Sequence, residues 1–496
     1  MGGGVAKVVE ALRAELGAGA VLTEPSALRA YDCDGLTTHR STPAAVILAD
    51  DPAAVATAVA RCHEFAVPFV ARGSGTGLSG GATPHADGVL IVTSKLRRIH
   101  RIDGESQRAY VDPGVINLDV TVAARPEGLY YAPDPSSQSV CSIGGNIAEN
   151  AGGAHCLKYG FTTNHVLGLD VVVPDGSTVS LGGAALDYPG YDLVGTFVGS
   201  EGTLGVATGA ILRLLPRPEA VRTLLAGFHS IEDAGEAVSS IIATGVLPAA
   251  IEMMDATAIL AVEATLPGRR GATASEAAYP EGAAAVLIVE LDGPAAEVAV
   301  ELAEAERLCH AAGAFSLRIA QSDEERLLIW KGRKSAFAAV GRISPDYYVQ
   351  DGVIPRTALP EVLGRIERLG AHYGLRVANV FHAGDGNLHP LVLFDGDIEG
   401  QAEAAEELAG EILRMCVELG GSITGEHGVG LDKKKYMTAM FTADDLQTMQ
   451  LVRCAFDPAG LANPGKLFPT PRLCGERPGP RRGVHPLVEA GAGDVF

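Results

Sequence analysis

Paired cysteines, long apolar runs and basic blocks are all missing from this 496-residue sequence, and each absence excludes a class of protein. The cysteines are scattered, with no C-x-x-C pair, at positions 33, 62, 141, 156, 309, 416, 454 and 474. This spacing argues against a zinc ribbon, a ferredoxin-type cluster and a disulfide framework. It is typical of a protein from a reducing compartment such as the cytoplasm.

Membrane and nucleic-acid partners are disfavoured as well. No apolar run approaches about 18 residues and the N-terminus has no signal-peptide core, so we expect a cytoplasmic protein, peripheral to a membrane at most through a partner. The net charge is −21, and the longest basic block is Lys433-Lys434-Lys435. Nucleic acid and anionic lipid surfaces are therefore poor candidate partners.

The length allows two or three domains with full cores.

The most informative stretch that is present begins at His382 and ends at His389, with the sequence HAGDGNLH. It lies between two apolar runs, 377–381 and 391–394, and its Asp-Gly pair is a strong two-residue hairpin signal. This turn predicts that the two histidines lie directly opposite each other, with Cβ atoms about 5 Å apart. Such a pair suits shared ligation of a divalent ion, although two ordinary sheet histidines would show the same pattern.

The N-terminal part shows alternating helix and strand patterns. We expect helices over 5–16 and 52–65, the latter capped by an aspartate of Asp50-Asp51-Pro52, and strands over 44–49 and 67–71. The second helix and its flanking strands read as a parallel crossover. Gly75, Gly77 and Gly80 then match G-x-G-x-x-G, but the next element is a strand, 88–92, rather than the helix of a dinucleotide fold. The loop can still cradle a phosphate, with a flexible surface loop as the alternative.

Two more glycine-rich segments follow, 133–153 and 199–206, among strands at 168–176 and 209–214. The first of them is nearly free of bulky residues, so we expect it to lie against a large ligand rather than in a core. Pro216-Arg217-Pro218 marks a domain boundary. Beyond it we expect a mostly antiparallel sheet with helices on one face: helices over 232–244, 296–312, 358–373 and 403–419, and strands over 222–228, 284–291, 314–319, 376–382 and 389–394.

Taken together, these segments resemble the FAD-linked oxidases of the vanillyl-alcohol oxidase / p-cresol methylhydroxylase type. Within that superfamily the chain looks most like the FAD-binding subunits of glycolate oxidases, among the D-2-hydroxy-acid dehydrogenases. The motifs that carry the resemblance span about 40–470 in order: Pro68–Gly77, Ile143–Gly153, Val198–Gly205, His382–His389, Thr424–Gly430 and Asn463–Lys466.

The resemblance implies an α+β chain with a two-part FAD-binding domain of the p-cresol methylhydroxylase type and a cap on an antiparallel sheet. We expect the FAD domain at 1–221 (core about 42–217), the cap at 222–430, a C-terminal return at 431–470 and a disordered tail at 471–496. Non-covalent FAD is expected, because the pyrophosphate loop has no histidine, with His155 a remote candidate for attachment. The implied cofactor residues are Arg72, Gly73, Ser74, Gly75, Thr76, Gly77, Pro133, Asp134, Ser137, Gly144, Gly145, Asn146, Asn150, Gly153, Glu201, Val206 and Asn463.

The chemistry of 2-hydroxy-acid oxidation suggests roles for the remaining polar residues. A divalent ion on His382, His389 and Glu426 would polarise the substrate oxygens, and zinc, manganese and iron(II) suit these ligands equally well. His427 is the expected base. The resemblance assigns the substrate carboxylate to Arg333, with Lys334 as runner-up. Tyr347 and Tyr348 are expected at the pocket, at most one of them facing it.

The sequence restricts the choice of substrate and of partner subunits less than it restricts the fold and the cofactor. The 2-hydroxyglutarate dehydrogenases carry an asparagine two residues after the second metal histidine, whereas Leu391 stands here, which favours a short acid such as glycolate or D-lactate. We therefore predict a FAD-dependent 2-hydroxy-acid dehydrogenase or oxidase, working with FAD-domain-like and iron–sulfur partner subunits or without partners. A D-2-hydroxyglutarate dehydrogenase is the alternative, and a metal-dependent hydrolase is the alternative from another class.

Overall fold

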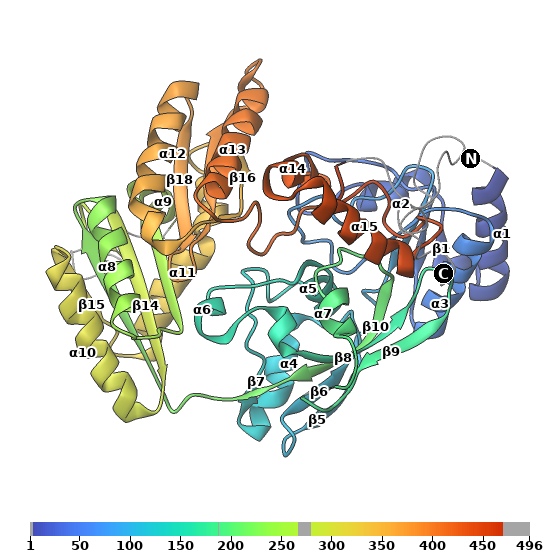
Figure 1. Cartoon of the computed structure of the whole chain (residues 1–496), viewed down its shortest axis with the longest axis horizontal. Coiled ribbons are helices and arrows are strands. Elements are labelled where there is room, and N and C mark those ends of the chain that lie inside the picture. Colours follow the sequence, from blue (N-terminus) through green and yellow to red (C-terminus); the bar gives the residue numbers. More distant parts are fainter. Residues whose placement is uncertain (1–2, 187, 266–278, 470–496) are drawn as a thin grey trace.

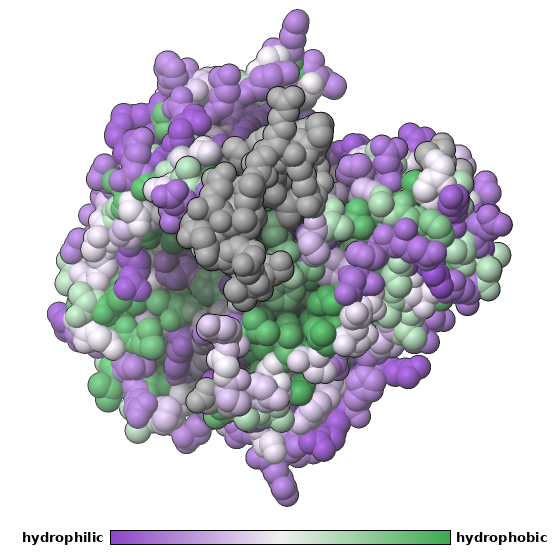
Figure 2. All heavy atoms as spheres, turned by 45° about the vertical axis from the view of Figure 1, so that its right-hand side comes forward, coloured by the Kyte–Doolittle hydropathy of each residue, from purple (hydrophilic) through white to green (hydrophobic). Residues whose placement is uncertain are grey.

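The computed structural model describes residues 3–186, 188–265 and 279–469, so the tail expected at 471–496 lies outside the described residues. An N-terminal half and a cap half each have their own sheets, and the last helices return to the N-terminal half (Figure 1). No helix in the described ranges is long and apolar enough to cross a membrane. Figure 2 shows one face of the molecule. Hydrophilic residues cover its projecting outer parts, and hydrophobic residues gather nearer its middle.

The N-terminal half contains two sheets. In the first, β2 (Ala45–Leu48) and β3 (Phe69–Arg72) both run parallel to β4 (Val89–Val92), which lies between them, and β1 (Val21–Leu22) pairs antiparallel with β2. Helices α1 (Gly3–Leu16) and α3 (Pro52–Glu64) pack on this sheet through an apolar core. The Asp51 carboxylate accepts a hydrogen bond from Ala54 N at 2.7 Å, which confirms the predicted helix cap.

The second sheet of this half is antiparallel, in the order β5-β6-β10-β8-β9. Its strands are β5 (Ile99–Asp103), β6 (Arg108–Val111), β8 (Val166–Val172), β9 (Thr178–Gly182) and β10 (Val206–Arg213). Against it pack α4 (Asn117–Ala124), α5 (Ile143–Glu149) and α7 (Leu193–Phe197). The sequence did not predict α5, because its glycines lower helix propensity, yet Ser142 caps it by accepting from Gly145 N.

The cap half is built on an antiparallel sheet in the order β15-β12-β14-β13-β18-β19-β17, with β20 pairing both β18 and β16. The strands are β12 (Ala220–Phe228), β13 (Ala250–Asp255), β14 (Ala285–Gly293), β15 (Ser316–Ile319), β16 (Asp346–Val349), β17 (Gly352–Val353), β18 (Arg376–His382), β19 (Asn387–Leu388) and β20 (Pro390–Phe394). The antiparallel arrangement is as predicted, although β13 and β17 were not foreseen.

Helices cover both faces of this sheet, so the prediction of one covered face was wrong. On one face lie α8 (Ile231–Ala243), α10 (Ala295–Ala311), α12 (Leu359–Tyr373) and α13 (Gln401–Glu418). On the other lie α9 (Ala256–Glu263) and α11 (Asp323–Val340). The helix α11 was missed because charged residues interrupt its apolar pattern, and it carries several residues of the site.

The chain then returns to the N-terminal half through α14 (Met437–Met440) and α15 (Ala443–Phe456), drawn in red in Figure 1. Phe69 N donates to Leu461 O at 2.9 Å, and Asn463 N donates to Phe69 O at 2.8 Å. The segment after α15 therefore extends the first sheet beside β3. This return brings residues 424–430 in between the two halves.

Candidate active site

The two histidines of the HAGDGNLH stretch lie on one hairpin, but its register differs from the prediction. His382 pairs with Asn387 and Asn379 with Pro390, so the loop has four residues, and His389 lies opposite Val380. Gly386 N donates to His382 O at 3.2 Å, which closes this longer loop. The register is shifted by two residues, which preserves the alternation of faces. Both imidazoles therefore remain on the same face as diagonal neighbours, with ring centroids 5.0 Å apart.

Glu426 completes a cluster with the two histidines. Its Oε1 lies 3.3 Å from His382 Nε2 and 3.4 Å from His389 Nε2. All three ligand atoms lie within 4.8 Å of one another, and both histidines are buried. Although burial raises the pKa of Glu426, its bond to His382 lowers it to about 2. Neither ring nitrogen of His389 has a hydrogen-bond partner within the described residues. Two imidazoles, a carboxylate and an unsatisfied buried nitrogen fit a divalent ion with open coordination positions.

Glu252 on β13 supports this cluster from behind. Its Oε1 lies 2.6 Å from His382 Nδ1 and its Oε2 accepts from Arg333 Nε at 2.6 Å. Such a contact fixes which nitrogen of a histidine faces a metal. Arg333, expected to grip the substrate, is itself buried in this pair and is not among the described residues that line the cavity. The sequence does hold a signal for Glu252, which was not predicted: its carboxylate interrupts the apolar run of β13.

His427 follows Glu426 and stacks on His389, with ring centroids 5.0 Å apart and planes 5° apart. Burial, with the nearby His389 and Lys433, lowers the pKa of His427 to about 4, although Asp351 opposes this shift. The imidazole is therefore neutral at physiological pH and can accept a proton. It lies beside the cluster, and its role as the base remains a prediction.

Asp351 lies beneath the segment 424–427 and was not identified from the sequence. Its carboxylate accepts hydrogen bonds from three consecutive backbone amides, at 425, 426 and 427, and from Thr424 Oγ1. Lys433 Nζ lies 3.1 Å from its Oδ2, and both side chains are buried. Burial alone would raise the pKa of Asp351, but the Lys433 ammonium holds it well below its usual range.

A cavity of about 720 Å³ connects this cluster with the glycine loop of the N-terminal half. Of the expected cofactor residues, those that line it are Arg72, Gly73, Ser74, Gly75, Thr76, Gly77, Ser137, Gly144, Gly145, Asn146, Glu201 and Val206. His389, Glu426 and His427 line the same cavity. Pro133, Asp134, Asn150, Gly153 and Asn463 are not among the described residues that line it.

The glycine loop is packed so closely against its neighbours that two of its positions have no space for a side chain. A Cβ at Gly73 would overlap the Ser142 hydroxyl, and one at Gly75, whose φ is +72°, would overlap the Arg72 guanidinium. The loop leads to β4 rather than to a helix, as predicted. Close backbone approach of this kind suits a pyrophosphate. The volume of the cavity and the small residues along it fit a dinucleotide cofactor.

The cap side of the cavity is lined by Lys334 and Phe337 of α11 and by residues 345–349 along β16. Tyr347 and Tyr348 both border it, as expected, because β16 runs along its edge. The Tyr348 hydroxyl donates to Asp432. Leu391, used above to narrow the substrate, is buried in the apolar core beneath α9 and α11 rather than in the lining.

A buried polar network joins the two halves beside this cavity. His155 Nδ1 lies 2.9 Å from Asp134 Oδ2, and its Nε2 lies 3.3 Å from Glu290 Oε1 on β14. Glu290 also accepts from Arg326 and Trp330 of α11. Although burial alone lowers it, the two carboxylates raise the pKa of His155 to about 10. His155 therefore has a structural ionic role.

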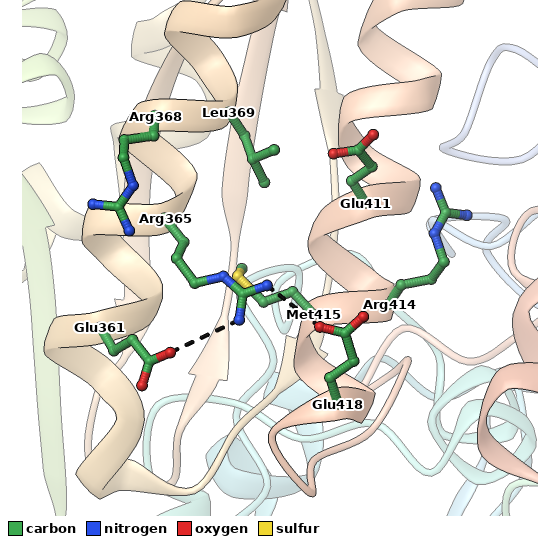
Figure 3. A pocket seen from close by; sticks show the side chains of 8 residues that line it. All are labelled: Glu361, Arg365, Arg368, Leu369, Glu411, Arg414, Met415 and Glu418. Carbon is green, nitrogen blue, oxygen red and sulfur yellow. Dashed lines mark hydrogen bonds and ion pairs between the residues drawn. The ribbon is translucent and has the colours of Figure 1, made fainter.

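A second hollow, of about 540 Å³, lies between α12 and α13 on the outside of the cap (Figure 3). Arg365 is held there between Glu361 at 3.8 Å and Glu418 at 3.3 Å. Its lining has neither the glycines nor the histidines of the larger cavity. The chemistry therefore belongs to the cavity between the two halves.

Family models match both halves of the chain. The model described as "FAD linked oxidases, C-terminal domain" matches residues 217–467, and the "FAD binding domain" model matches residues 43–182. Two solved structures share the fold at low sequence identity. One is 4-ethylphenol oxidase from Gulosibacter chungangensis, with a TM-score of 0.78 at 18% identity, covering 94% of this chain and 98% of that one. The other is p-cresol methylhydroxylase, with a TM-score of 0.76 at 17% identity, covering 94% and 97%.

Curated relatives agree with these matches. Glycolate oxidase subunit GlcD of Escherichia coli K12 is 50% identical over 469 residues, covering 95% of this chain and 92% of the relative. The protein of the same name from Bacillus subtilis is 39% identical over 439 residues, covering 88% and 92%. D-lactate dehydrogenase of Archaeoglobus fulgidus is 34% identical over 410 residues, covering 82% and 87%.

Proposed function

Because this chain belongs to the FAD-linked oxidases, we propose that it oxidises a short D-2-hydroxy acid, glycolate or D-lactate, to the 2-oxo acid. Its membership makes it a FAD-linked oxidoreductase, and this excludes the metal-dependent hydrolase that the sequence left open. The observation that carries the proposal is one cavity bordered both by the phosphate-loop glycines and by His389, Glu426 and His427.

The oxidation removes a hydride from C2 and a proton from the hydroxyl group. FAD, held without a covalent bond along the glycine loop, supplies the hydride acceptor when bound. A divalent ion, when bound by His382, His389 and Glu426, supplies a Lewis acid for the substrate oxygens. His427 takes the hydroxyl proton at its imidazole, which is neutral before the reaction.

We propose that Lys334, rather than Arg333, receives the substrate carboxylate. Lys334 lines the cavity and is partly exposed, whereas Arg333 is committed to Glu252. Among the described residues on the cap side of the cavity, Lys334 is the single lysine or arginine. One cation matches one carboxylate, and the neighbouring Phe337 is apolar. This argument favours a short monocarboxylic acid over 2-hydroxyglutarate, which needs a second partner for its distal carboxylate.

We further propose that the electrons leave through a partner chain, since the two GlcD relatives are named as subunits of glycolate oxidase. Substrate choice is tested by anaerobic titration of the flavin absorbance near 450 nm with glycolate, D-lactate, L-lactate and D-2-hydroxyglutarate. We expect bleaching by glycolate or D-lactate and slower bleaching by D-2-hydroxyglutarate. Preferential bleaching by D-2-hydroxyglutarate would contradict the one-cation argument.

A further inference from the structure

The segment 424–430 carries both Glu426 and His427, yet it is neither helix nor strand. Its conformation is therefore determined by the contacts that its backbone makes. Two buried carboxylates provide them. Asp351, from the cap half, accepts from the amides of 425, 426 and 427. Glu201, from the N-terminal half, accepts from Val429 N and Gly430 N, both at 2.7 Å.

Asp351 binds the part of this segment that does chemistry. The amides that point to it belong to Glu426 and His427 themselves, at 3.2 and 2.8 Å, and to the glycine before them, at 3.0 Å. Thr424 Oγ1 adds a bond at 2.6 Å and in turn accepts from Gly428 N at 3.0 Å. Three consecutive amides that converge on one carboxylate leave little freedom of the backbone torsions between them.

We propose that Asp351 is a positioning residue, which fixes the backbone of 424–427 so that Glu426 reaches the two histidines and His427 faces the substrate. It acts through these residues and does not line the cavity. This inference rests on the proposed function and adds a residue to its machinery. Lys433, on the same carboxylate, supplies the countercharge without which a buried aspartate would be costly.

The same arrangement explains why one of two neighbouring donor sets suits a metal. Asp351, His389 and His427 also lie within ligand distance of one another. In that set the Asp351 oxygens are already engaged by the amides and by the Lys433 ammonium at 3.1 Å. In the other set the partners of Glu426 among the described residues are histidines, with no ammonium group. The Asp351 oxygens are therefore not available as ligands, and a cation is expected to bind to His382, His389 and Glu426 instead.

The test compares Asp351→Asn with the wild type and with Asp255→Asn as a matched control. Asp255 is likewise buried and accepts backbone amides, from Ala258 N at 2.8 Å and Asn379 N at 2.9 Å, but outside the cluster. The FAD-loaded proteins are titrated with Zn²⁺ against a chromophoric chelator in the absence of substrate. We expect Asp351→Asn to weaken zinc binding about 10- to 100-fold, the range seen when partners of metal ligands are removed. FAD content should stay unchanged because Glu201 still holds 429–430.

A second readout separates positioning from a general loss of structure. At saturating Zn²⁺, kcat of Asp351→Asn should stay at least about tenfold below wild type while KM changes less than about threefold, because His427 is misplaced even when the metal is bound. The Asp255→Asn control should match wild type in both zinc affinity and kcat. Zinc affinity and kcat of Asp351→Asn within twofold of wild type would overturn the inference. A wild-type chain that binds none of Zn²⁺, Mn²⁺ and Fe²⁺ would contradict the proposed function itself, which keeps the two failures distinct.

If Asp351→Asn does not fold, Thr424→Val gives the same test in a milder form. This change removes the hydrogen bond to Asp351 and the one accepted from Gly428 N, and keeps both charges and the volume of the side chain. We expect a three- to tenfold loss of zinc affinity with full FAD content. Unchanged zinc affinity in Thr424→Val would overturn the inference.

Discussion

Replacing Glu252 by Gln tests how the proposed metal site is supported. The carboxylate binds two buried side chains at once, His382 at 2.6 Å and Arg333 at 2.6 Å. The Arg333 and Glu252 side chains are only 3% and 1% exposed, so water cannot replace the lost charge. The substitution keeps the shape of the residue but leaves the guanidinium without a countercharge. It also weakens the bond that orients His382 toward Glu426.

Two separate losses follow from this geometry. Breaking a buried ion pair by removing one partner costs about 3–5 kcal/mol of folding free energy, and glutamine recovers part of this by accepting one bond, so we expect about 3 kcal/mol. Removing the partner of a metal-bound histidine costs about 10- to 100-fold in metal affinity. The stability loss arises from Arg333, whereas the loss of metal affinity arises from His382.

A double variant separates these two effects. Glu252→Gln with Arg333→Met removes the stranded charge as well, so we expect it to recover about half or more of the folding free energy but none of the metal affinity. Stability is measured by urea unfolding with a chelator present, because bound metal would itself stabilise the folded state. Metal affinity is measured by Zn²⁺ competition on the folded proteins.

Two results would refute this reasoning. The first is zinc affinity of Glu252→Gln within twofold of wild type, since the His382 contact would then be irrelevant to the site. The second is an Arg333→Met variant that raises KM for the hydroxy acid at full metal content. Arg333 would then bind substrate, as the family resemblance implied, and the assignment of its charge to Glu252 would be wrong.

Three further predictions concern other parts of the site. Lys334→Met should lower kcat/KM about 10- to 100-fold by raising KM, because the substrate loses a charged hydrogen bond, while FAD and metal stay bound. The control is Lys331→Met, at an exposed neighbouring position, and equal kinetics for both variants would contradict the assignment. Because the pKa of His155 is about 10, its ion pairs contribute a few kcal/mol to stability below about pH 6.5, and this contribution is lost as the pH rises through 10. His155→Gln should flatten that part of the stability–pH curve, and an unchanged curve would contradict the ionic role. Gly73→Ala should weaken FAD binding at least about tenfold in a fluorescence titration, because its Cβ overlaps the Ser142 hydroxyl; wild-type affinity would show that the loop does not hold the cofactor.

Local signals in the sequence predicted much of the scaffold. The Asp51 cap, the apolar strand runs and the glycine loop followed by a strand depend on residues close together in the chain, and the structure has each of them. The hairpin register failed by two residues because the Asp-Gly rule assumes the shortest turn, whereas Gly386 N closes a longer one onto His382 O. The two-residue period of the strands still kept both histidines on one face.

Tertiary contacts explain what the sequence did not reveal. Nothing near Glu252 or Asp351 in the chain identifies their partners. His382, the partner of Glu252, lies 130 residues away, and Glu426, whose amide binds Asp351, lies 75 residues away. Arg333 and Lys334 are adjacent on α11, and only the packing of that helix decides which one reaches the cavity. A buried charge in an apolar run is the signal that such residues do leave, because an isolated charge cannot be buried without a partner.

The central claim is that the histidine–glutamate cluster and the flavin act on one substrate in one cavity. It is tested most directly by stopped-flow reduction of the FAD-loaded, metal-depleted protein with D-lactate or glycolate under anaerobic conditions, before and after one equivalent of Zn²⁺ or Mn²⁺ is added. The account predicts negligible bleaching near 450 nm without metal and rapid bleaching after its addition, with no recovery in His389→Ala. Equally fast flavin reduction with and without metal would contradict it.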